Sequence, residues 1–206
     1  MIVVHHLNDS RSQRVLWLLE ELGLPYEIRH YARDATTRLA PPELLAVHAL
    51  GKSPVLEENG LKIIESGAII DYLIRRHGGG KLQPAAGTPE FEVYNQWLHY
   101  AEGSAMLPLM LKLYTSRLGD AAAPLAPRIS SELANHLGYV NGSLQGRDWL
   151  LGQDFSGADI QMSFVGEAAR ALRADYPAMD AWVRRCQARP AYQRALERGG
   201  PYALAS

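Results

Sequence analysis

The chain has 206 residues, of which 47% are hydrophobic, and its formal net charge is −1. This length allows one large domain or two small ones with a sizeable core, and the ordinary apolar content excludes a disordered chain. A nearly neutral chain lacks the strongly basic face typical of nucleic-acid binders. Cys186 is the only cysteine, which excludes an internal disulfide and fits a reducing compartment. No stretch approaches the roughly 20 apolar residues of a membrane span, and the first residues do not form a signal peptide. We therefore expect a cytoplasmic protein with neither nucleic acid nor a membrane as a partner.

The first 80 residues predict alternating strands and helices. Residues 1–7 form a short β-rich run, and residues 26–31 alternate in the manner of a second strand. Between them, four apolar residues recur at helical spacing and predict a helix over 11–22; they are Val15, Leu18, Leu19 and Leu22. Gly23 follows at the position where a helix end favours glycine. A loop over 32–42 and a short helix over 42–49 complete this part.

A β-hairpin is predicted next. The apolar runs 54–57 and 61–64 flank Asn59-Gly60, and Asn-Gly between such runs is a strong hairpin signal. An apolar helical pattern then ends at the glycines 78–80. The element order βαβαββα predicts an α/β domain with a parallel front pair of strands and an added antiparallel hairpin.

The second half predicts helices alone. Residues 78–89 are rich in Gly, Pro and Ala, which is typical of a linker. The predicted helices after this linker are 90–118, 127–145, 157–172, 178–188 and 190–198. We therefore expect two domains, an α/β domain over 1–80 and an all-α domain over 88–206.

Two short segments could carry chemistry. Pro54 opens an apparent strand although it lacks the N–H that a ladder needs, so Ser53–Pro54 is either an ordinary trans bond at an edge or a cis bond with a geometric purpose. Ser66 lies where a helix begins, as its N-cap, and a helix N-terminus attracts carboxylates. Glu65 beside it could pair with an ammonium group. The pair suits a zwitterionic head, although an ordinary capped helix with a solvated glutamate explains the same residues.

Three segments together resemble the glutathione S-transferase superfamily, in particular its bacterial, serine-type, theta-like members. They are HHLNDSRSQRVLWLLEELGLPYE near the start, GKSPVL followed by ES at 65–66, and Ser156-Gly157-Ala158-Asp159. The last segment also predicts a capping box with a role in folding. The resemblance implies a thioredoxin-like N-terminal domain that binds glutathione and an all-helical C-terminal domain.

The resemblance also implies roles for individual residues. Pro54 would be a cis-proline, and the backbone of Ser53 would hydrogen-bond the cysteinyl part of glutathione. Glu65 and Ser66 would hold the γ-glutamyl end, and Lys52 would meet the glycine carboxylate, although a solvated lysine is the commoner outcome.

The catalytic group must stabilise a thiolate, because a free thiol with a pKa near ~8.5 is mostly protonated at neutral pH. Family members place a tyrosine, serine or cysteine just after the first strand, and here the first tyrosine is Tyr26. Ser10 precedes Arg14 by the spacing of serine-type members, so Ser10 is our candidate. Ser12 and Asn8 are alternatives, and Ser10 could instead only cap the helix that follows.

We therefore expect a transferase that conjugates glutathione to hydrophobic electrophiles in detoxification or a catabolic pathway. Met106, Met110 and Tyr114 could line the electrophile site, although core packing is the commoner explanation for any one of them. Alternatives are a non-catalytic protein that binds glutathione or hydrophobic ligands, and a glutathione-dependent isomerase or peroxidase. No metal or organic cofactor is implied, since glutathione is a co-substrate. The family leads us to expect a homodimer.

Overall fold

The computed structural model describes residues 1–204. The chain divides into two compact units, and each is described by itself. Residues 1–82 and the segment from Cys186 onward make the first unit, and residues 83–185 make the second.

A mixed sheet forms the centre of the first unit. Its strands are β1 (Ile2–Leu7), β2 (Tyr26–Tyr31), β3 (Val55–Glu58) and β4 (Leu61–Ile63). The strand order is β2-β1-β3-β4, with β1 parallel to β2 and the other two pairings antiparallel. Asn59 and Gly60 take φ values of 51° and 82° in the β3–β4 turn, as a two-residue Asn-Gly hairpin requires. The predicted parallel pair and hairpin are confirmed.

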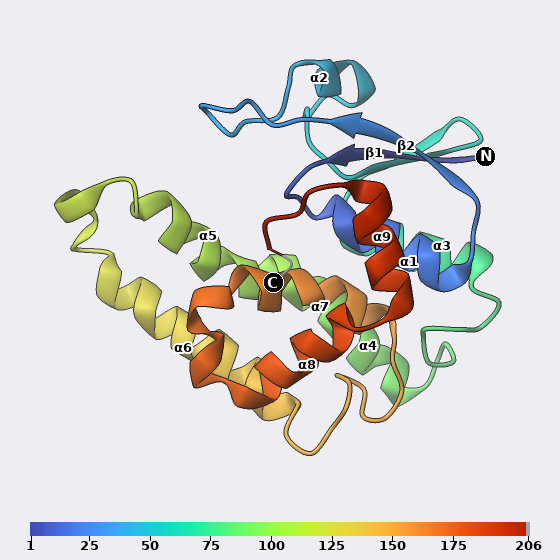
Figure 1. Ribbon diagram of the computed structural model, residues 1–206. Coiled ribbons are helices and arrows are strands. Elements are labelled where there is room, and N and C mark those ends of the chain that lie inside the picture. The colour runs from blue at the N-terminus through green and yellow to red at the C-terminus, as the bar shows by residue number, and fades with distance from the viewer. Residues whose placement is uncertain (205–206) are drawn as a thin grey trace. The chain divides into compact units, whose positions relative to one another are not determined.

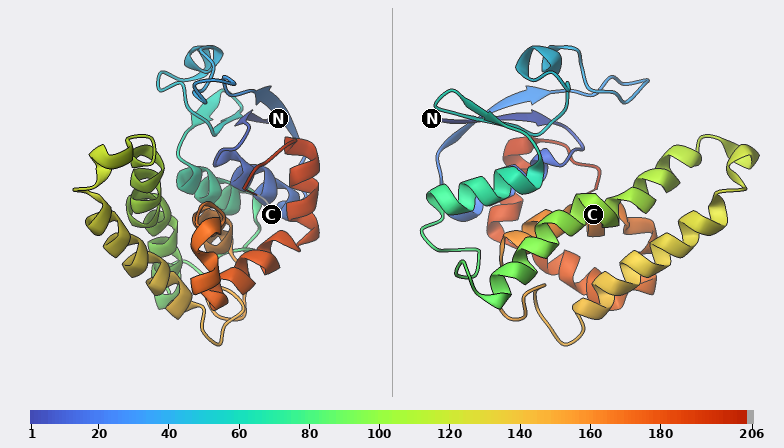
Figure 2. Two further views of the ribbon diagram at one scale, coloured as in Figure 1. Left: turned by 60° about the vertical axis from the view of Figure 1, so that its left-hand side comes forward. Right: turned by 180° about the vertical axis from the view of Figure 1, so that it is seen from behind.

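Four helices cover this sheet. Three lie on one face, and they are α1 (Ser12–Leu22), α3 (Ser66–His77) and α9 (Pro190–Gly199); the short α2 (Glu43–Val47) lies on the other face (Figures 1 and 2). Helix α1 is buried over most of its length and ends at Gly23, which is left-handed with φ 64°. The thioredoxin-like order βαβαββα is thus present, with α9 added from the end of the chain.

Helix α9 is held to α1 by rings and by ion pairs. Trp17 and Tyr192 meet edge to face with centroids 5.2 Å apart. The guanidinium of Arg189 donates to both carboxylate oxygens of Glu21, at 2.5 and 2.9 Å, which is the bidentate geometry that favours arginine. The domain limits 1–80 and 88–206 stay a prediction. The two compact units differ from these limits at the end of the chain. The last helix, α9, belongs to the sheet unit.

The second unit is helical throughout. Its α-helices are α4 (Pro89–Tyr100), α5 (Met106–Thr115), α6 (Ala126–Ser143), α7 (Gly157–Ala168) and α8 (Pro177–Gln187), of which the last runs into the first unit. Shorter turns are a π-helix (Ala101–Ala105) and two 3₁₀ turns (Gly119–Ala122 and Arg170–Asp175). The expected all-α second half is confirmed.

The predicted single helix over 90–118 is wrong, because a π-turn separates α4 from α5. Pro108 explains the break, since proline has no N–H to offer the carbonyl of Ser104 and its ring would clash there. A π-turn widens the helix by one residue, and such turns are common where regular bonding fails. The predicted helix over 157–172 likewise ends early, at Ala168.

The N-terminus of α7 carries the expected capping box. The Asp159 carboxylate accepts from the backbone N–H of Ser156 at 2.9 Å, while the Ser156 side chain caps the first turn. Asp159 also accepts from the Leu150 N–H and from the Trp182 indole N–H, both at 3.0 Å. A single buried carboxylate therefore ties three chain segments of the second unit together.

Replacing Asp159 by alanine is expected to destabilise the protein by about 3 kcal/mol, because three buried N–H groups lose a charged acceptor. Ser156→Ala is expected to cost only about 1 kcal/mol, the usual loss of an N-cap. Denaturant unfolding measures both. The matched control is Asp154→Ala, since Asp154 is exposed five residues away. Equal losses for Asp154→Ala and Asp159→Ala would contradict the assigned role.

Candidate functional site

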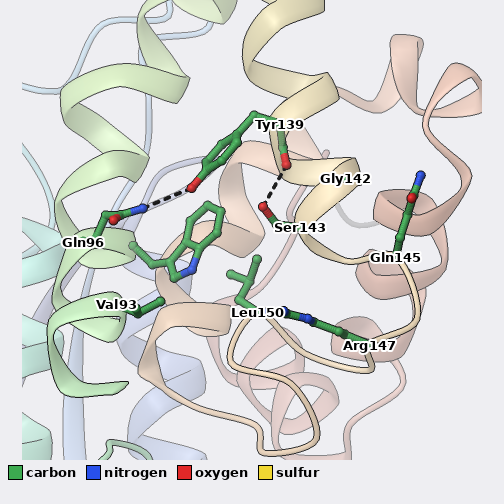
Figure 3. Close-up of a pocket in the computed structure, with 9 residues that line it drawn as sticks. Val93, Gln96, Tyr139, Gly142, Ser143, Gln145, Arg147 and Leu150 are labelled. Carbon is green, nitrogen blue, oxygen red and sulfur yellow. Dashed lines mark hydrogen bonds between the residues drawn. The ribbon is translucent and has the colours of Figure 1, made fainter. Parts of the chain in front are cut away.

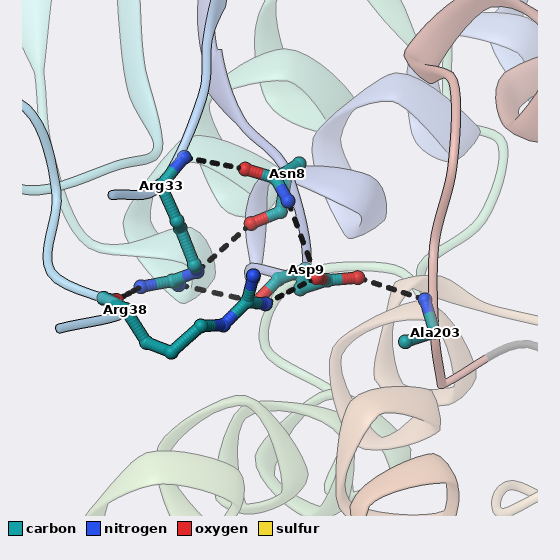
Figure 4. A network of polar contacts seen from close by, with 5 residues as sticks. All are labelled: Asn8, Asp9, Arg33, Arg38 and Ala203. Carbon is teal, nitrogen blue, oxygen red and sulfur yellow. Dashed lines mark hydrogen bonds and ion pairs between the residues drawn. The ribbon is translucent and has the colours of Figure 1, made fainter. Parts of the chain in front are cut away.

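The loop after β1 is clamped by two arginines. Arg33 donates from its backbone N–H to the Asn8 amide oxygen at 2.8 Å and from its guanidinium to the backbone carbonyls of Asn8 and Asp9. The Asn8 amide nitrogen donates to the Asp9 carboxylate (Figure 4). Both polar atoms of the Asn8 side chain thus have structural partners, which weakens the case for Asn8 as the group that stabilises a thiolate.

Asp9 connects this loop to the end of the chain. Its φ is 50°, and its carboxylate accepts from Arg38 at 2.6 Å and from the Ala203 N–H at 2.8 Å (Figure 4). Burial alone would raise the pKa of Asp9, but the Ala203 and Arg38 hydrogen bonds lower it on balance. The segment after α9 therefore helps to hold the residue that precedes Ser10.

Ser10 and Ser12 face each other beneath this loop. Ser10 is 5% exposed and Ser12 is fully buried, and their hydroxyl oxygens are 2.8 Å apart. The Ser12 oxygen also lies 2.7 Å from Nδ1 of His6 and 3.2 Å from the Leu7 carbonyl. The N-cap position of α1 is Arg11, which makes no side-chain cap, while the Ser10 oxygen accepts the Ser12 N–H at 3.2 Å. Ser10 is thus both a local support of the helix start and a link in a buried polar chain.

The Ser53–Pro54 peptide bond is cis. The Ser53 hydroxyl donates to the His5 carbonyl at 2.8 Å and accepts from the Leu7 N–H at 3.1 Å. This side chain therefore joins the lead-in of β3 to the end of β1. Among the described residues, nothing hydrogen-bonds the backbone N–H or carbonyl of Ser53, so both groups are available to a ligand.

The start of α3 differs from the sequence prediction. Glu65, with φ 68° and ψ 115°, occupies the N-cap position, and Ser66 is the first helical residue; the expectation that Ser66 is the N-cap is wrong. The Ser66 hydroxyl instead accepts from the Arg14 guanidinium at 3.0 Å. Glu65 is exposed. A carboxylate ligand at this helix end would meet unpaired backbone N–H groups, and Glu65 is accessible to an ammonium group.

The remaining candidates are less tightly placed. Lys52 is exposed and makes no ion pair with any described residue. Along α5, Met106 is buried, Met110 is half-buried and Tyr114 is 60% exposed. A ligand could therefore reach Met110 and Tyr114 directly, whereas Met106 fills the interior.

A separate concavity of about 240 Å³ lies in the second unit, between α4 and α6. Trp97 and Tyr139 stack there with ring centroids 5.4 Å apart, and Gln96 donates to the Tyr139 hydroxyl (Figure 3). Arg147 and Gln145 lie at its rim (Figure 3). None of the predicted site residues lines it.

Comparison with known proteins identifies the family. The N-terminal domain model of glutathione S-transferases matches residues 1–75, and the C-terminal domain model matches residues 104–190. Glutathione S-transferase 3 of Schizosaccharomyces pombe is 33% identical, and the match covers 96% of this chain and 88% of that protein. The chain therefore belongs to the glutathione S-transferase family and is a glutathione transferase.

Solved structures agree with the fold. A glutathione S-transferase from Actinobacillus pleuropneumoniae has a TM-score of 0.92 at 34% identity, over 99% of this chain and 95% of that one. A glutathione transferase family member from Pseudomonas fluorescens, with two glutathione bound, has a TM-score of 0.80 at 28% identity, over 95% and 92% of the two chains. Within residues 1–204, no helix has the length and apolar character needed to cross a bilayer.

Sequence reasoning missed several residues that support the site. The spacing of Ser10 and Arg14 was noted, but the bond from Arg14 to Ser66 was not foreseen. His6 falls within the predicted first strand, and its contact with Ser12 depends on how α1 packs on β1. A signal was present in the run Ser12-Gln13-Arg14, because three polar residues interrupt the buried side of an apolar helix.

His6 makes stability depend on pH. Burial, followed by the neighbouring His30, lowers the pKa of His6 from 6.5 to about 4. Between these values the unfolded chain binds a proton that the folded protein does not, so stability present above pH 6.5 is lost as pH falls towards 4, by up to about 3 kcal/mol. We expect His6→Gln to flatten this part of the unfolding profile. His99→Gln, at an exposed position, should keep the wild-type slope, and a slope unchanged in His6→Gln would exclude His6 as the titrating group.

Proposed function

We propose that the protein conjugates the thiolate of glutathione to hydrophobic electrophiles, with Ser10 as the group that donates a hydrogen bond to the thiolate. The observation that carries this proposal is the grouping of three serines in the first unit. The Ser53 hydroxyl accepts a hydrogen bond from Leu7, the last residue of β1, and Ser10 follows that strand in the chain. The Ser66 hydroxyl accepts a hydrogen bond from Arg14 on α1. Family membership supplies the substrate class.

The charges and the peptide groups of glutathione support its binding to these residues. The free backbone groups of Ser53 suit the cysteinyl amide, which could pair with them in the manner of an added strand. The start of α3 at Ser66 suits the γ-glutamyl carboxylate, and exposed Glu65 suits its ammonium group. Lys52 is then available to the glycine carboxylate. The two bound glutathione molecules of the Pseudomonas fluorescens relative support glutathione as the ligand here.

For the electrophile we propose an apolar molecule that contacts Met110 and Tyr114, with Met106 behind them. Methionine suits varied apolar partners because its side chain is flexible and polarisable. We further propose a cytoplasmic homodimer with a role in detoxification or catabolism. The buried Cys186, which is not part of a disulfide, is compatible with a reducing compartment.

An isomerase, a peroxidase and a non-catalytic binding protein would use the same glutathione-binding residues. Product analysis separates them. A conjugate supports the transferase, a rearranged substrate the isomerase and oxidised glutathione the peroxidase. Binding of glutathione without turnover of any electrophile supports the non-catalytic reading.

Ser10→Ala is expected to bind glutathione but to lower kcat/KM for conjugation of an aryl halide on the order of 100-fold, the usual effect of removing one donor to a developing anion. The variant also loses the acceptor of the Ser12 N–H, so its folding is checked by thermal unfolding first. Ser116→Ala changes an exposed serine of the second unit and should leave the rate unchanged. Full activity in folded Ser10→Ala would assign thiolate stabilisation to another group.

Glu65→Gln tests the other end of the ligand. Losing the charge opposite the γ-glutamyl ammonium is expected to weaken glutathione binding on the order of tenfold, with little change in kcat, as calorimetry and kinetics will measure. Glu27→Gln is the matched control, since Glu27 is exposed on β2. Unchanged affinity in Glu65→Gln would remove Glu65 from the site.

A further inference from the structure

The concavity between α4 and α6 brings together hydrogen-bond donors that have no acceptor within the protein. Trp97 lines it and is 3% exposed, and its indole N–H donates to none of the described residues. The Tyr139 hydroxyl accepts from the Gln96 amide at 3.1 Å (Figure 3). Because a phenol can donate as well as accept, the Tyr139 proton is still available. A ligand that carries acceptor atoms would therefore meet two neutral donors here.

Arg147 adds a positive charge that no carboxylate of the described residues neutralises. Its side chain extends towards Leu150 in the concavity (Figure 3), and it makes no ion pair or side-chain hydrogen bond with any described residue. The neighbouring Asp148 pairs instead with Arg185, at 3.2 Å. None of the described residues that line the concavity is Asp or Glu. The lining residues therefore attract an anion and present no charge that would repel it.

An apolar surface lies beside these donors. Val93, Trp97 and Leu150 all line the concavity, and the Trp97 ring stacks on Tyr139 with centroids 5.4 Å apart. Trp97 and Leu150 are buried, so packing holds this surface in place. The volume of about 240 Å³ lies just below the roughly 300–1,000 Å³ of sites for drug-sized ligands. The ligand that fits is therefore small, about the size of a single ring with a short substituent.

We propose that this concavity binds a small aromatic carboxylate. The carboxylate accepts from the Arg147 guanidinium, whose planar fork suits a carboxylate, and from the Trp97 N–H, with the Tyr139 hydroxyl as a third donor. The aromatic ring lies on the apolar surface of Val93 and Leu150. None of the residues proposed to bind glutathione lines this concavity, so the proposal does not rest on the proposed function.

The indole N–H signal of Trp97 in a nuclear magnetic resonance spectrum tests the site, with phenylacetate as the probe. The chain has four tryptophans, and the Trp97 signal is the one that is absent in Trp97→Phe. We expect phenylacetate to move this signal saturably, because the N–H gains a charged acceptor. The indoles of Trp17 and Trp182 already donate to Glu21 and Asp159, so their signals should stay in place.

Two changes of charge test whether the site selects an anion. Phenylacetamide has nearly the shape of phenylacetate without its charge, and we expect it to bind at least about tenfold more weakly to the wild type. Arg147→Gln is expected to weaken phenylacetate binding on the order of tenfold for the same reason. The matched control is Arg117→Gln, which removes the same charge from an exposed position after α5 and should leave the affinity unchanged. Thermal unfolding checks that both variants are folded.

The wild type alone can overturn the proposal. Equal binding of the acid and the amide, or no binding of phenylacetate, would do so without any variant. Binding that leaves the Trp97 signal in place, or that has the same affinity in folded Arg147→Gln, would locate the acid elsewhere on the protein and would also overturn it. Glutathione binding is measured separately and bears only on the proposed function.

Discussion

The position of the Ser12 hydroxyl is the constraint on which the candidate site depends. It is fully buried at the first residue of α1 and has three polar neighbours, His6, Leu7 and Ser10. A buried hydroxyl without a partner costs about 1–3 kcal/mol, so the loop between β1 and α1 must keep these neighbours in place. The loop conformation is therefore determined from inside the protein, by the interior contact of α1 with β1, as well as by the arginine clamp on its outer side.

The end of the chain contributes to the same loop from two directions. Gly199, at the end of α9, lies close to the His6 ring, and the Ala203 N–H donates to Asp9. A Cβ at Gly199 would lie 2.9 Å from the end of the Leu16 side chain and 3.0 Å from the amide oxygen of Gln13, so the close approach of α9 to α1 favours glycine here. The ion pair of Arg189 with Glu21 fixes this approach at the opposite end of the helix. Residues near the end of the chain therefore help to hold the loop near its beginning that carries Ser10.

The sequence predicted the elements of the first unit well, because their signals are local. Gly23 as a helix end and Asn59-Gly60 as a hairpin turn depend on backbone preferences of the residues themselves. The π-turn over Ala101–Ala105 was missed, since the apolar pattern runs through it and only the steric demand of Pro108 reveals it. The packing of α9 on α1 was also missed, because an amphipathic helix does not specify which apolar face will cover it.

The same limit separates the site residues that could be predicted from those that could not. The resemblance to the family implied a cis bond at Ser53–Pro54, and the bond is cis. The local pattern predicted Ser66 as the N-cap of a helix, but Ser66 is the first helical residue. The Ser66 hydroxyl accepts a hydrogen bond from Arg14 on helix α1. No local rule predicts a contact between residues so distant in sequence. For Ser10 the local rule and the tertiary contact coexist, since its oxygen accepts the N–H of Ser12 while the two hydroxyls meet. A serine can therefore support a helix start through its lone pairs and keep its proton for chemistry, which is why capping and catalysis are not exclusive explanations of this residue.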